Sequence, residues 1–185
     1  MPSFSDVRLA SARLDLRPLG PADTDAVFAM RADPVVQRYG SHPPWTQRQQ
    51  AVDYIERNLR VMAAGTDAQF AIVRRTDAAV VGTCTLYQLD AQCRLAQVGY
   101  ALRRSDWGQG YAVEAVTTLL DWGFETLDLN RVEADIDPRN LPSLRTLERL
   151  AFTREGHLRE RWIVGGEISD SLIYGLLARE WKARP

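Results

Sequence analysis

The chain has 185 residues, of which 45% are hydrophobic and 25% are charged, and its formal net charge is -1. A chain of this length predicts a single domain, residues 1–185, with a core large enough to need no metal or disulfide for stability. Its acidic and basic residues are interspersed, which argues against direct nucleic-acid binding and against a basic membrane surface.

The first third of the chain predicts a strand followed by two helices. Leu14 and Leu16 alternate with charged neighbours as in a strand, and residues 20–34 combine helix-starting Asp residues with apolar residues at helical spacing. Residues 46–64 predict the second helix, which ends at Gly65. The expected apolar face of this helix consists of Val52, Ile55, Leu59 and Met62.

The middle of the chain predicts a three-stranded meander. Its strands are expected at residues 69–75, 79–89 and 93–103, which are rich in β-branched and aromatic residues. A turn near residues 90–92 would pair Cys93 with about Leu89 rather than with Cys84, so no disulfide is expected.

The last third predicts a helix, a strand, a second helix and a hairpin. Apolar residues recur at helical spacing from Gly110 to about Leu127, and residues 131–137 then alternate as a strand. The second helix starts with Asn140 as its N-cap and Pro142 in its first turn. Its expected core-facing residues are Leu144, Leu147 and Leu150, and the hairpin that follows turns at Gly165 and Gly166.

Targeting segments and metal sites are not apparent. No stretch approaches the 18 or more apolar residues of a membrane helix, and the N-terminus lacks the apolar run of a signal peptide. His42 and His157 are far apart, and no Cys/His cluster has metal-ligand spacing. We therefore expect a cytoplasmic protein without a membrane or metal partner.

Two glycines lie where the helix predicted from Gly110 to about Leu127 must begin, in "DWGQGYA", residues 106–112. Glycine costs about 1 kcal/mol inside a helix, so these positions favour an unusual backbone conformation or the close approach of an anion to the helix N-terminus. The sequence lacks the Lys-Ser or Lys-Thr pair of a P-loop, and Val113 occupies the third glycine position of a dinucleotide fingerprint.

The chain resembles the GNAT superfamily of N-acetyltransferases, in particular the branch of the Rim-type ribosomal-protein N-terminal acetyltransferases. The similar segments span nearly the whole chain: "RLDLRPL", "DPVVQRY", "VGYALRRSDWGQGYAVEAV", "NRVEADIDPRNLPSLRTLERLAF" and "EGHLRERWIVGGEISDSLIYGLL". The resemblance implies an α/β (α+β) acyl-CoA N-acyltransferase fold, with a mixed, mostly antiparallel sheet of about seven strands and about four flanking helices.

The resemblance also implies where acetyl-CoA, the cosubstrate, binds. Its pantetheine arm would pair with the strand end at Tyr100, Ala101 and Leu102. Its pyrophosphate would contact the backbone of Gly108, Gln109, Gly110, Tyr111, Ala112 and Val113. Trp107 departs from the Gln or Arg of the family pattern, but the backbone cradle does not need that side chain. Asn140 would contact the cofactor arm as well as cap its helix.

The resemblance leaves the catalytic residues less defined. Many GNAT enzymes carry a tyrosine seven residues after the matching Asn, where this chain has Leu147; Ser143 matches the Rim-type serine and would donate to the departing thiolate. Candidates for the general base are Asp135 and Glu160. Each carboxylate has the alternative of lying on a solvated strand face, as the alternation of Glu133, Asp135 and Asp137 indicates.

Aromatic residues and acceptor identity complete the expectations. Trp45, Trp162 and Tyr174 would line an acceptor cleft or belong to the core. The implied reaction is direct attack of a primary amine on the acetyl thioester, with a protein N-terminus as the expected acceptor. The alternatives are a small amine such as a polyamine, amino acid or aminoglycoside, and a catalytically silent acyl-CoA-binding module. The sequence does not decide between a monomer and a homodimer.

Overall fold

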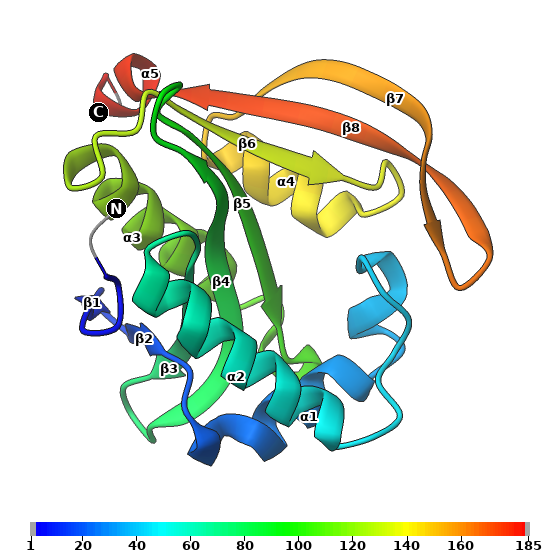
Figure 1. The fold of residues 1–185 in the computed structure, drawn as a ribbon. Coiled ribbons are helices and arrows are strands. Elements are labelled where there is room, and N and C mark those ends of the chain that lie inside the picture. Colours follow the sequence, from blue (N-terminus) through cyan, green and yellow to red (C-terminus); the bar gives the residue numbers. More distant parts are fainter. Residues whose placement is uncertain (1–2, 184–185) are drawn as a thin grey trace.

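A computed structural model, described over residues 3–183, contains one eight-stranded sheet with helices on both faces (Figure 1). The strands are β1 (Leu9–Ala10), β2 (Leu14–Pro18), β3 (Ala68–Arg74), β4 (Ala79–Asp90), β5 (Leu95–Leu102), β6 (Arg131–Ile136), β7 (Thr153–Val164) and β8 (Glu167–Leu177). The α-helices are α1 (Thr24–Ala32), α2 (Gln49–Ala64), α3 (Tyr111–Glu125), α4 (Leu141–Arg149) and α5 (Ala178–Lys182). Short 3-10 turns are η1 (Pro21–Asp23), η2 (Val36–Tyr39) and η3 (Arg104–Asp106).

The sheet has the order β1-β2-β3-β4-β5-β6-β8-β7, and every neighbouring pair is antiparallel except β5 and β6. This mixed, mostly antiparallel sheet confirms the predicted fold class. Two short elements raise the counts above the predicted ones: β1 has only two residues, and α5 has five. Neither was marked by a periodic pattern, because such short segments contain less than one full repeat.

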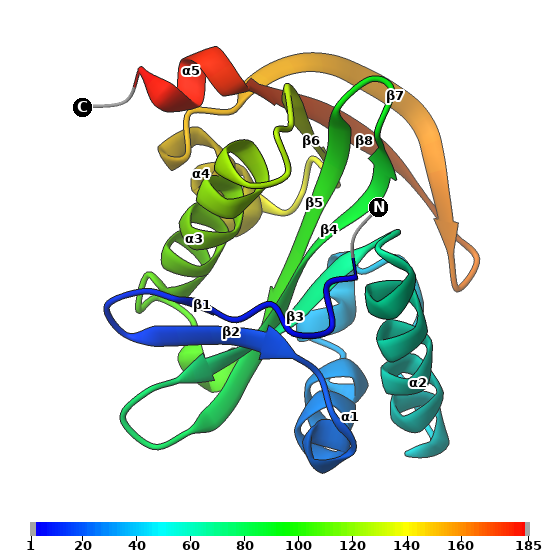
Figure 2. The ribbon, with the colours of Figure 1, turned by 60° about the vertical axis from the view of Figure 1, so that its left-hand side comes forward.

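The helices divide the core into two layers. Figure 2 shows α3 and α4 on one face of the sheet and α1 and α2 on the other. The larger cluster packs α3 against the middle strands through residues such as Leu119, Leu86 and Val132. The smaller cluster lies under α1 and α2 and includes Val27 and Ile55.

The two parallel strands at the centre of the sheet separate along their length. β5 pairs with β6 only at Leu95, Ala96 and Gln97, whereas its other edge pairs with β4 as far as Leu102. Figure 1 shows β5 and β6 diverging beyond this short paired segment. The edge of β5 that faces away from β4 therefore has no strand partner from Val98 to Leu102, and its backbone groups there are available to a ligand.

The structure corrects two details of the sequence analysis. Helix α2 buries Ala51, Ile55, Asn58 and Met62, whereas the predicted face residue Leu59 is 40% exposed. The buried face is thus rotated toward the side that carries Asn58, whose amide donates to the side chain of Gln69 at 2.6 Å. The turn after β4 spans residues 91–94 rather than 90–92, because Asp90 still pairs with Leu95.

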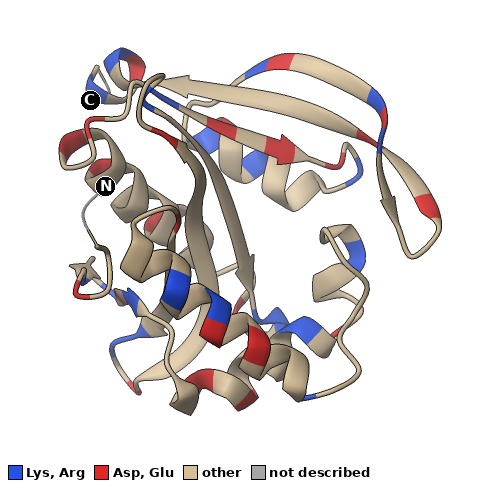
Figure 3. Cartoon of the chain, viewed as in Figure 1, with Lys and Arg blue, Asp and Glu red and all other residues tan. Residues whose placement is uncertain are grey.

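The predicted glycine positions at the end of α2 and in the last hairpin are confirmed. Gly65 ends α2 in the left-handed conformation, with φ of 69°, and the β7–β8 turn uses Gly165 and Gly166 at positive φ. Cys84 and Cys93 are both free. Figure 3 shows Lys and Arg interspersed with Asp and Glu along the elements. Within residues 3–183 no helix combines the length and the hydropathy required to cross a bilayer.

Candidate functional site

A large groove begins where β5 and β6 separate. It has a volume of about 780 Å³ and lies between the end of β5, the loop before α3, the first turns of α4 and the η2 segment. All of the predicted cofactor contacts except Gln109 line it: Tyr100, Ala101, Leu102, Gly108, Gly110, Tyr111, Ala112, Val113, Asn140 and Ser143. The fold therefore brings together segments that are about 40 residues apart in the sequence.

The glycine loop has the backbone conformation that its sequence suggests. Gly108 and Gly110 have φ of 76° and 80°, a left-handed region that other residues enter at a cost. A Cβ at Gly108 would meet no atom within 4 Å, and one at Gly110 would meet only a guanidinium nitrogen of Arg13 at 3.5 Å. The glycines are therefore needed for backbone shape, and the space beside them is open to a ligand.

Two ion-paired clusters hold this loop in place. Asp106, in η3, accepts hydrogen bonds from Arg74 and Arg103, each at 2.7 Å, although its side chain is only 2% exposed. On the other side, Arg13 donates to the carbonyl of Gln109 at 3.0 Å and to Glu114 at 2.6 Å. Sequence reasoning missed both clusters, because Arg74 is distant in the sequence from Asp106, and Arg13 is distant from Gln109 and Glu114.

The groove is suited to a polyphosphate. The first backbone N–H groups of α3 have no intrahelical acceptors and lie at the positive end of the helix dipole. Arg145 and Arg149 of α4 line the same groove, and neither forms an ion pair with any residue between 3 and 183. The residues present therefore fit the pyrophosphate-containing cofactor that the sequence implied.

The first turn of α4 gathers three polar groups. The side chain of Asn140 accepts a hydrogen bond from the backbone N–H of Ser143 at 3.3 Å, which confirms its prediction as N-cap. The hydroxyl of Tyr100, from β5, donates to the carbonyl of Ser143 at 3.4 Å. Leu147 of α4 is fully buried and contributes to the core, as the helical spacing of the leucines predicted.

Trp107 closes one edge of the groove. Its indole N–H donates to the carbonyl of Leu102 at 2.9 Å, and its side chain lines the groove while remaining 43% exposed. The residue that departs from the family pattern thus ties the glycine loop to the end of β5. Its ring provides an apolar wall beside Gly108 and Gly110.

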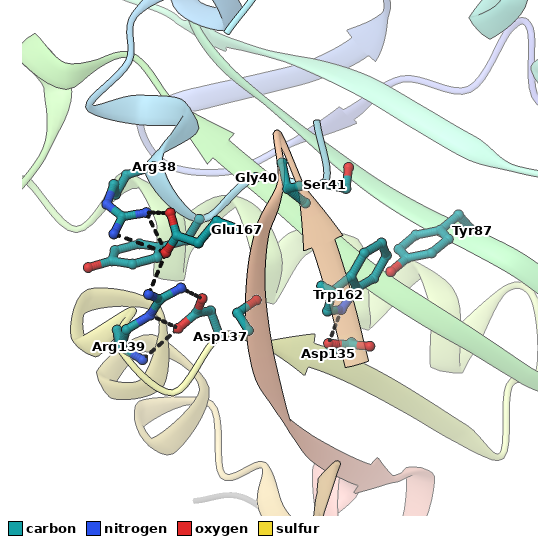
Figure 4. Close-up of a pocket in the computed structure, with 12 residues that line it drawn as sticks. Arg38, Gly40, Ser41, Tyr87, Asp135, Asp137, Arg139, Trp162 and Glu167 are labelled. Carbon is teal, nitrogen blue, oxygen red and sulfur yellow. Dashed lines mark hydrogen bonds and ion pairs between the residues drawn. The ribbon is translucent and has the colours of Figure 1, made fainter. Parts of the chain in front are cut away.

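A second, smaller cavity adjoins the groove. It has a volume of about 160 Å³ and shares Arg38, Tyr39 and Gly40 of the η2 segment with the groove. Its other walls come from the ends of β4, β6 and the β7–β8 hairpin, and Figure 4 shows the polar side chains that line it. We call it the η2 pocket.

Asp135 lies in the η2 pocket with its side chain 11% exposed. It accepts a hydrogen bond from the indole of Trp162 at 3.1 Å (Figure 4). It also accepts one from the hydroxyl of Ser171, while the guanidinium of Arg161 lies 3.8 Å away. Its hydrogen bonds come from two neutral donors, and its ion pair with Arg161 is longer than the 2.6 Å pairs that Arg139 forms with Asp137 and Glu167. The alternating carboxylates of β6 are therefore half-buried and hydrogen-bonded, not on a solvated face.

The remaining charges of the η2 pocket neutralise one another. Arg139 pairs with Asp137 and with Glu167, and Arg38 also pairs with Glu167, as Figure 4 shows. Burial by itself would raise the pKa of Asp137, but the hydrogen bonds from Arg139 outweigh it and the pKa is lowered. Hydrogen bonds from Arg139 and Arg38 likewise lower the pKa of Glu167.

Tyr87 forms the wall of the η2 pocket near Asp135. Burial raises its pKa to about 12, and the negative charge of Asp135 adds to the shift. The phenol is therefore neutral at any physiological pH.

The other candidates lie elsewhere. Glu160 is exposed on β7, has φ of 52° and lines neither cavity. Of the three aromatic candidates, Trp162 lines the η2 pocket, whereas Trp45 and Tyr174 are buried in the two core clusters. Among residues 3–183, no group of three or more His, Cys, Asp or Glu side chains has the arrangement of a metal site.

Comparison with known proteins finds a family model and relatives that match this chain. The family model described as an acetyltransferase (GNAT) domain matches residues 13–153. A relative from Bacillus licheniformis, named "Uncharacterized N-acetyltransferase p20", is 37% identical over 173 residues, which cover 94% of this chain and 97% of the relative.

Two further proteins carry names that mention acceptors. "Putative ribosomal N-acetyltransferase YdaF" of Bacillus subtilis is 35% identical over 106 residues, which cover 57% of this chain and 58% of that protein. The crystal structure of spermidine N-acetyltransferase from Vibrio cholerae in complex with CoA and spermine superimposes with a TM-score of 0.83. It is 18% identical and covers 93% of this chain and 99% of that one, a likeness of fold alone.

Proposed function

Because the chain belongs to the GNAT family of acetyltransferases, we propose that it transfers the acetyl group of acetyl-CoA to the α-amino group of a protein N-terminus. GNAT acetyltransferases use acetyl-CoA, and a thioester supplies an already activated acyl group. The chain's own residues then need to align the amine, accept its proton and stabilise the departing thiolate. The observation that supports an α-amino acceptor is the η2 pocket, which adjoins the cofactor groove and contains Asp135.

Charge in the η2 pocket favours a single amine. Three carboxylates and two guanidiniums line it, and both guanidiniums are already paired. A free amino acid would bring a carboxylate for which the pocket has no unpaired cation. A polyamine would bring several ammonium groups, but of the three carboxylates that line the pocket only Asp135 lacks a short ion pair, its nearest guanidinium being that of Arg161 at 3.8 Å.

Size favours the end of a larger molecule. At about 160 Å³, the η2 pocket is smaller than the roughly 300–1,000 Å³ of a site that encloses a whole drug-sized ligand. The first residue of a polypeptide would fill it while the rest of the acceptor remained outside. An α-amino group is also easier to deprotonate than a lysine side chain, because its pKa is about 7.7–8.0 rather than about 10.4.

In the proposed reaction, Asp135 receives a proton from the amine, directly or through a water. The loop at Gly108–Val113 binds the pyrophosphate through backbone N–H groups, and the unpaired edge of β5 near Leu102 orients the thioester. Asn140 positions the cofactor arm, and the hydroxyl of Ser143 stabilises the departing thiolate by a hydrogen bond.

The test is a thiol-release assay with acetyl-CoA and a panel of amines. Peptides that begin with Ala, Ser or Met are compared with the same peptides N-terminally blocked and carrying one lysine, and with spermidine and an aminoglycoside. We expect turnover with the free N-terminal peptides and little with the blocked ones. Faster turnover of spermidine or of the lysine side chain would overturn the α-amine assignment.

A further inference from the structure

The groove contains tyrosine side chains, one of which reaches the first turn of α4. Leu147 occupies the position at which many GNAT enzymes carry a tyrosine, and it is fully buried in the core. Three tyrosines line the groove: Tyr39, Tyr100 and Tyr111. They differ in what surrounds their rings, and this difference selects one of them.

Tyr39 and Tyr111 are engaged by cations. The Tyr39 ring has the guanidinium of Arg38 at 5.3 Å and that of Arg139 at 5.7 Å, where the groove adjoins the η2 pocket. The Tyr111 ring lies under Arg13 at 4.7 Å, in the first turn of α3 beside the glycine loop. Within residues 3–183, neither of these two hydroxyls is hydrogen-bonded to the first turn of α4, as the hydroxyl of Tyr100 is.

Tyr100 lies on the segment of β5 that has no strand partner on its outer edge, and its side chain crosses to α4. Its hydroxyl donates to the carbonyl of Ser143 at 3.4 Å, a long and therefore weak hydrogen bond that a ligand atom can replace. Burial raises the pKa of this phenol above its usual value of about 10, so it carries its proton at neutral pH.

We propose that Tyr100 is the general acid that protonates the sulfur of CoA as the acetyl group leaves, a role that rests on the acetyl transfer proposed above. Attack of the neutral amine forms the C–N bond and breaks the C–S bond. The phenolic proton of Tyr100 passes to the sulfur, and the surplus amine proton passes to Asp135. Solvent then returns a proton to the phenolate and removes one from Asp135, so that free thiol and amide are the only products.

Tyr100 and Ser143, which are neighbours in space, would have different roles at the sulfur. A serine hydroxyl is too weak an acid to give up its proton, whereas a phenol, with an ordinary pKa of about 10, is a far stronger acid than an alcohol. Ser143 would contribute a hydrogen bond to the sulfur, and Tyr100 would contribute the proton itself. Tyr100, from β5, and Ser143, from the first turn of α4, both line the groove.

The test compares Tyr100→Phe with wild type on two acyl donors, acetyl-CoA and the acetyl selenoester of the selenium analogue of CoA. A selenolate leaves without needing a proton. Under single-turnover conditions we expect the variant to lose about 100-fold in rate with the thioester, near the lower end of general-acid effects, and little with the selenoester. Tyr174→Phe, a buried tyrosine outside both cavities, is the control and should stay near the wild-type rate.

Binding provides an independent measurement. If the phenol reaches the sulfur, Tyr100→Phe should weaken binding of CoA by about three- to ten-fold, as loss of one hydrogen bond does, and should leave the affinity for desulfo-CoA unchanged. Calorimetry measures both affinities without turnover. Equal losses for the two ligands would mean that Tyr100 only shapes the groove.

A further variant covers the case in which Tyr100→Phe does not fold. Replacing Tyr100 by 3-fluorotyrosine preserves the shape and makes the phenol more acidic, so the alkaline fall of kcat should move to lower pH. An unchanged pH profile, or equal rate losses on thioester and selenoester, would overturn the assignment of Tyr100. Absence of thiol release by wild type with every amine would instead overturn the proposed function.

Discussion

Single residues shape the two cavities: two glycines through their backbone conformation in the groove, and Asp135 through its charge in the η2 pocket. Gly108 and Gly110 adopt φ values that exclude most side chains, and the space beside them is open. Asp135 accepts hydrogen bonds from neutral donors and has only a 3.8 Å ion pair with Arg161, while Asp137 and Glu167 form shorter pairs with arginines. The open space beside the two glycines and the carboxylate of Asp135 are thus available to a ligand.

Gly110 offers a matched test of the pyrophosphate site. Asn and Asp have nearly the same shape, and both tolerate the left-handed conformation better than other residues. Gly110→Asp should bind acetyl-CoA at least about ten-fold more weakly than Gly110→Asn, because only Asp adds a negative charge beside the pyrophosphate. Calorimetry on the two folded variants measures the ratio, and equal affinities would show that no anion binds at this position.

Asp135 and Glu160 offer a second matched pair. Asp135→Asn should lower kcat by about ten-fold or more, since it removes the base but keeps the hydrogen-bonded shape, whereas Glu160→Gln should retain the wild-type rate. The wild-type rate should climb between about pH 6 and 8 as the acceptor amine loses its proton. Steady-state kinetics with one N-terminal peptide across this range distinguishes them; a loss confined to Glu160→Gln would reverse the assignment.

At the scale of elements, η3 illustrates how a loop is fixed by its neighbours. Asp106 joins η3 to β3 and to the end of β5 through Arg74 and Arg103, and its carboxylate is almost fully buried. Burial by itself would raise its pKa, but hydrogen bonds from Arg103 and Ser105 and the two positive charges lower it overall. The glycine loop therefore starts from a rigid turn.

Asp106→Asn should destabilise the protein by about 1.5–3 kcal/mol, the usual effect of losing hydrogen bonds to a charged group. Because the folded state lowers the pKa of Asp106, its contribution is complete above the unfolded value of about 3.9 and is lost as the pH falls through the folded value. The difference in unfolding free energy between wild type and variant, measured in urea, should therefore be full at pH 7 and shrink below about pH 4. A difference independent of pH would contradict the charged role.

At the scale of the whole molecule, the separation of β5 from β6 creates both cavities. The groove and the η2 pocket share residues of the η2 segment, so a cofactor and an acceptor would meet at the same opening in the sheet. Helices cover both faces of the sheet that contains this opening, as Figure 2 shows.

Ligand binding should therefore stabilise the molecule and protect the opening. At 100 times its Kd, CoA should raise the unfolding free energy by about 2.7 kcal/mol, as mass action requires. Hydrogen exchange should slow at the amides of Tyr100–Leu102 and in the first turns of α3 and α4, because these segments line the groove. Protection elsewhere, with none along β5, would place the ligand at another site.

The sequence by itself determined the order and nature of most elements. Periodicity predicted α2, α3, α4 and the central strands, because burying one face imposes a repeat of 3.6 or 2 residues. Capping chemistry predicted Asn140 as an N-cap, and glycine spacing indicated the loop before α3, since both depend on residues close together in the chain. Short elements and the exact face of α2 escaped this reasoning.

Only the tertiary structure decided which distant residues meet. It set Asp135 beside Trp162 and Ser171 and left Glu160 on an exposed strand, although both carboxylates looked alike in the sequence. It also carried the hydroxyl of Tyr100 to α4 across the opening beside β5. A one-dimensional pattern records which face a residue occupies, whereas its partners depend on strand order, register and the separation of β5 from β6, which arise only when the whole sheet has formed.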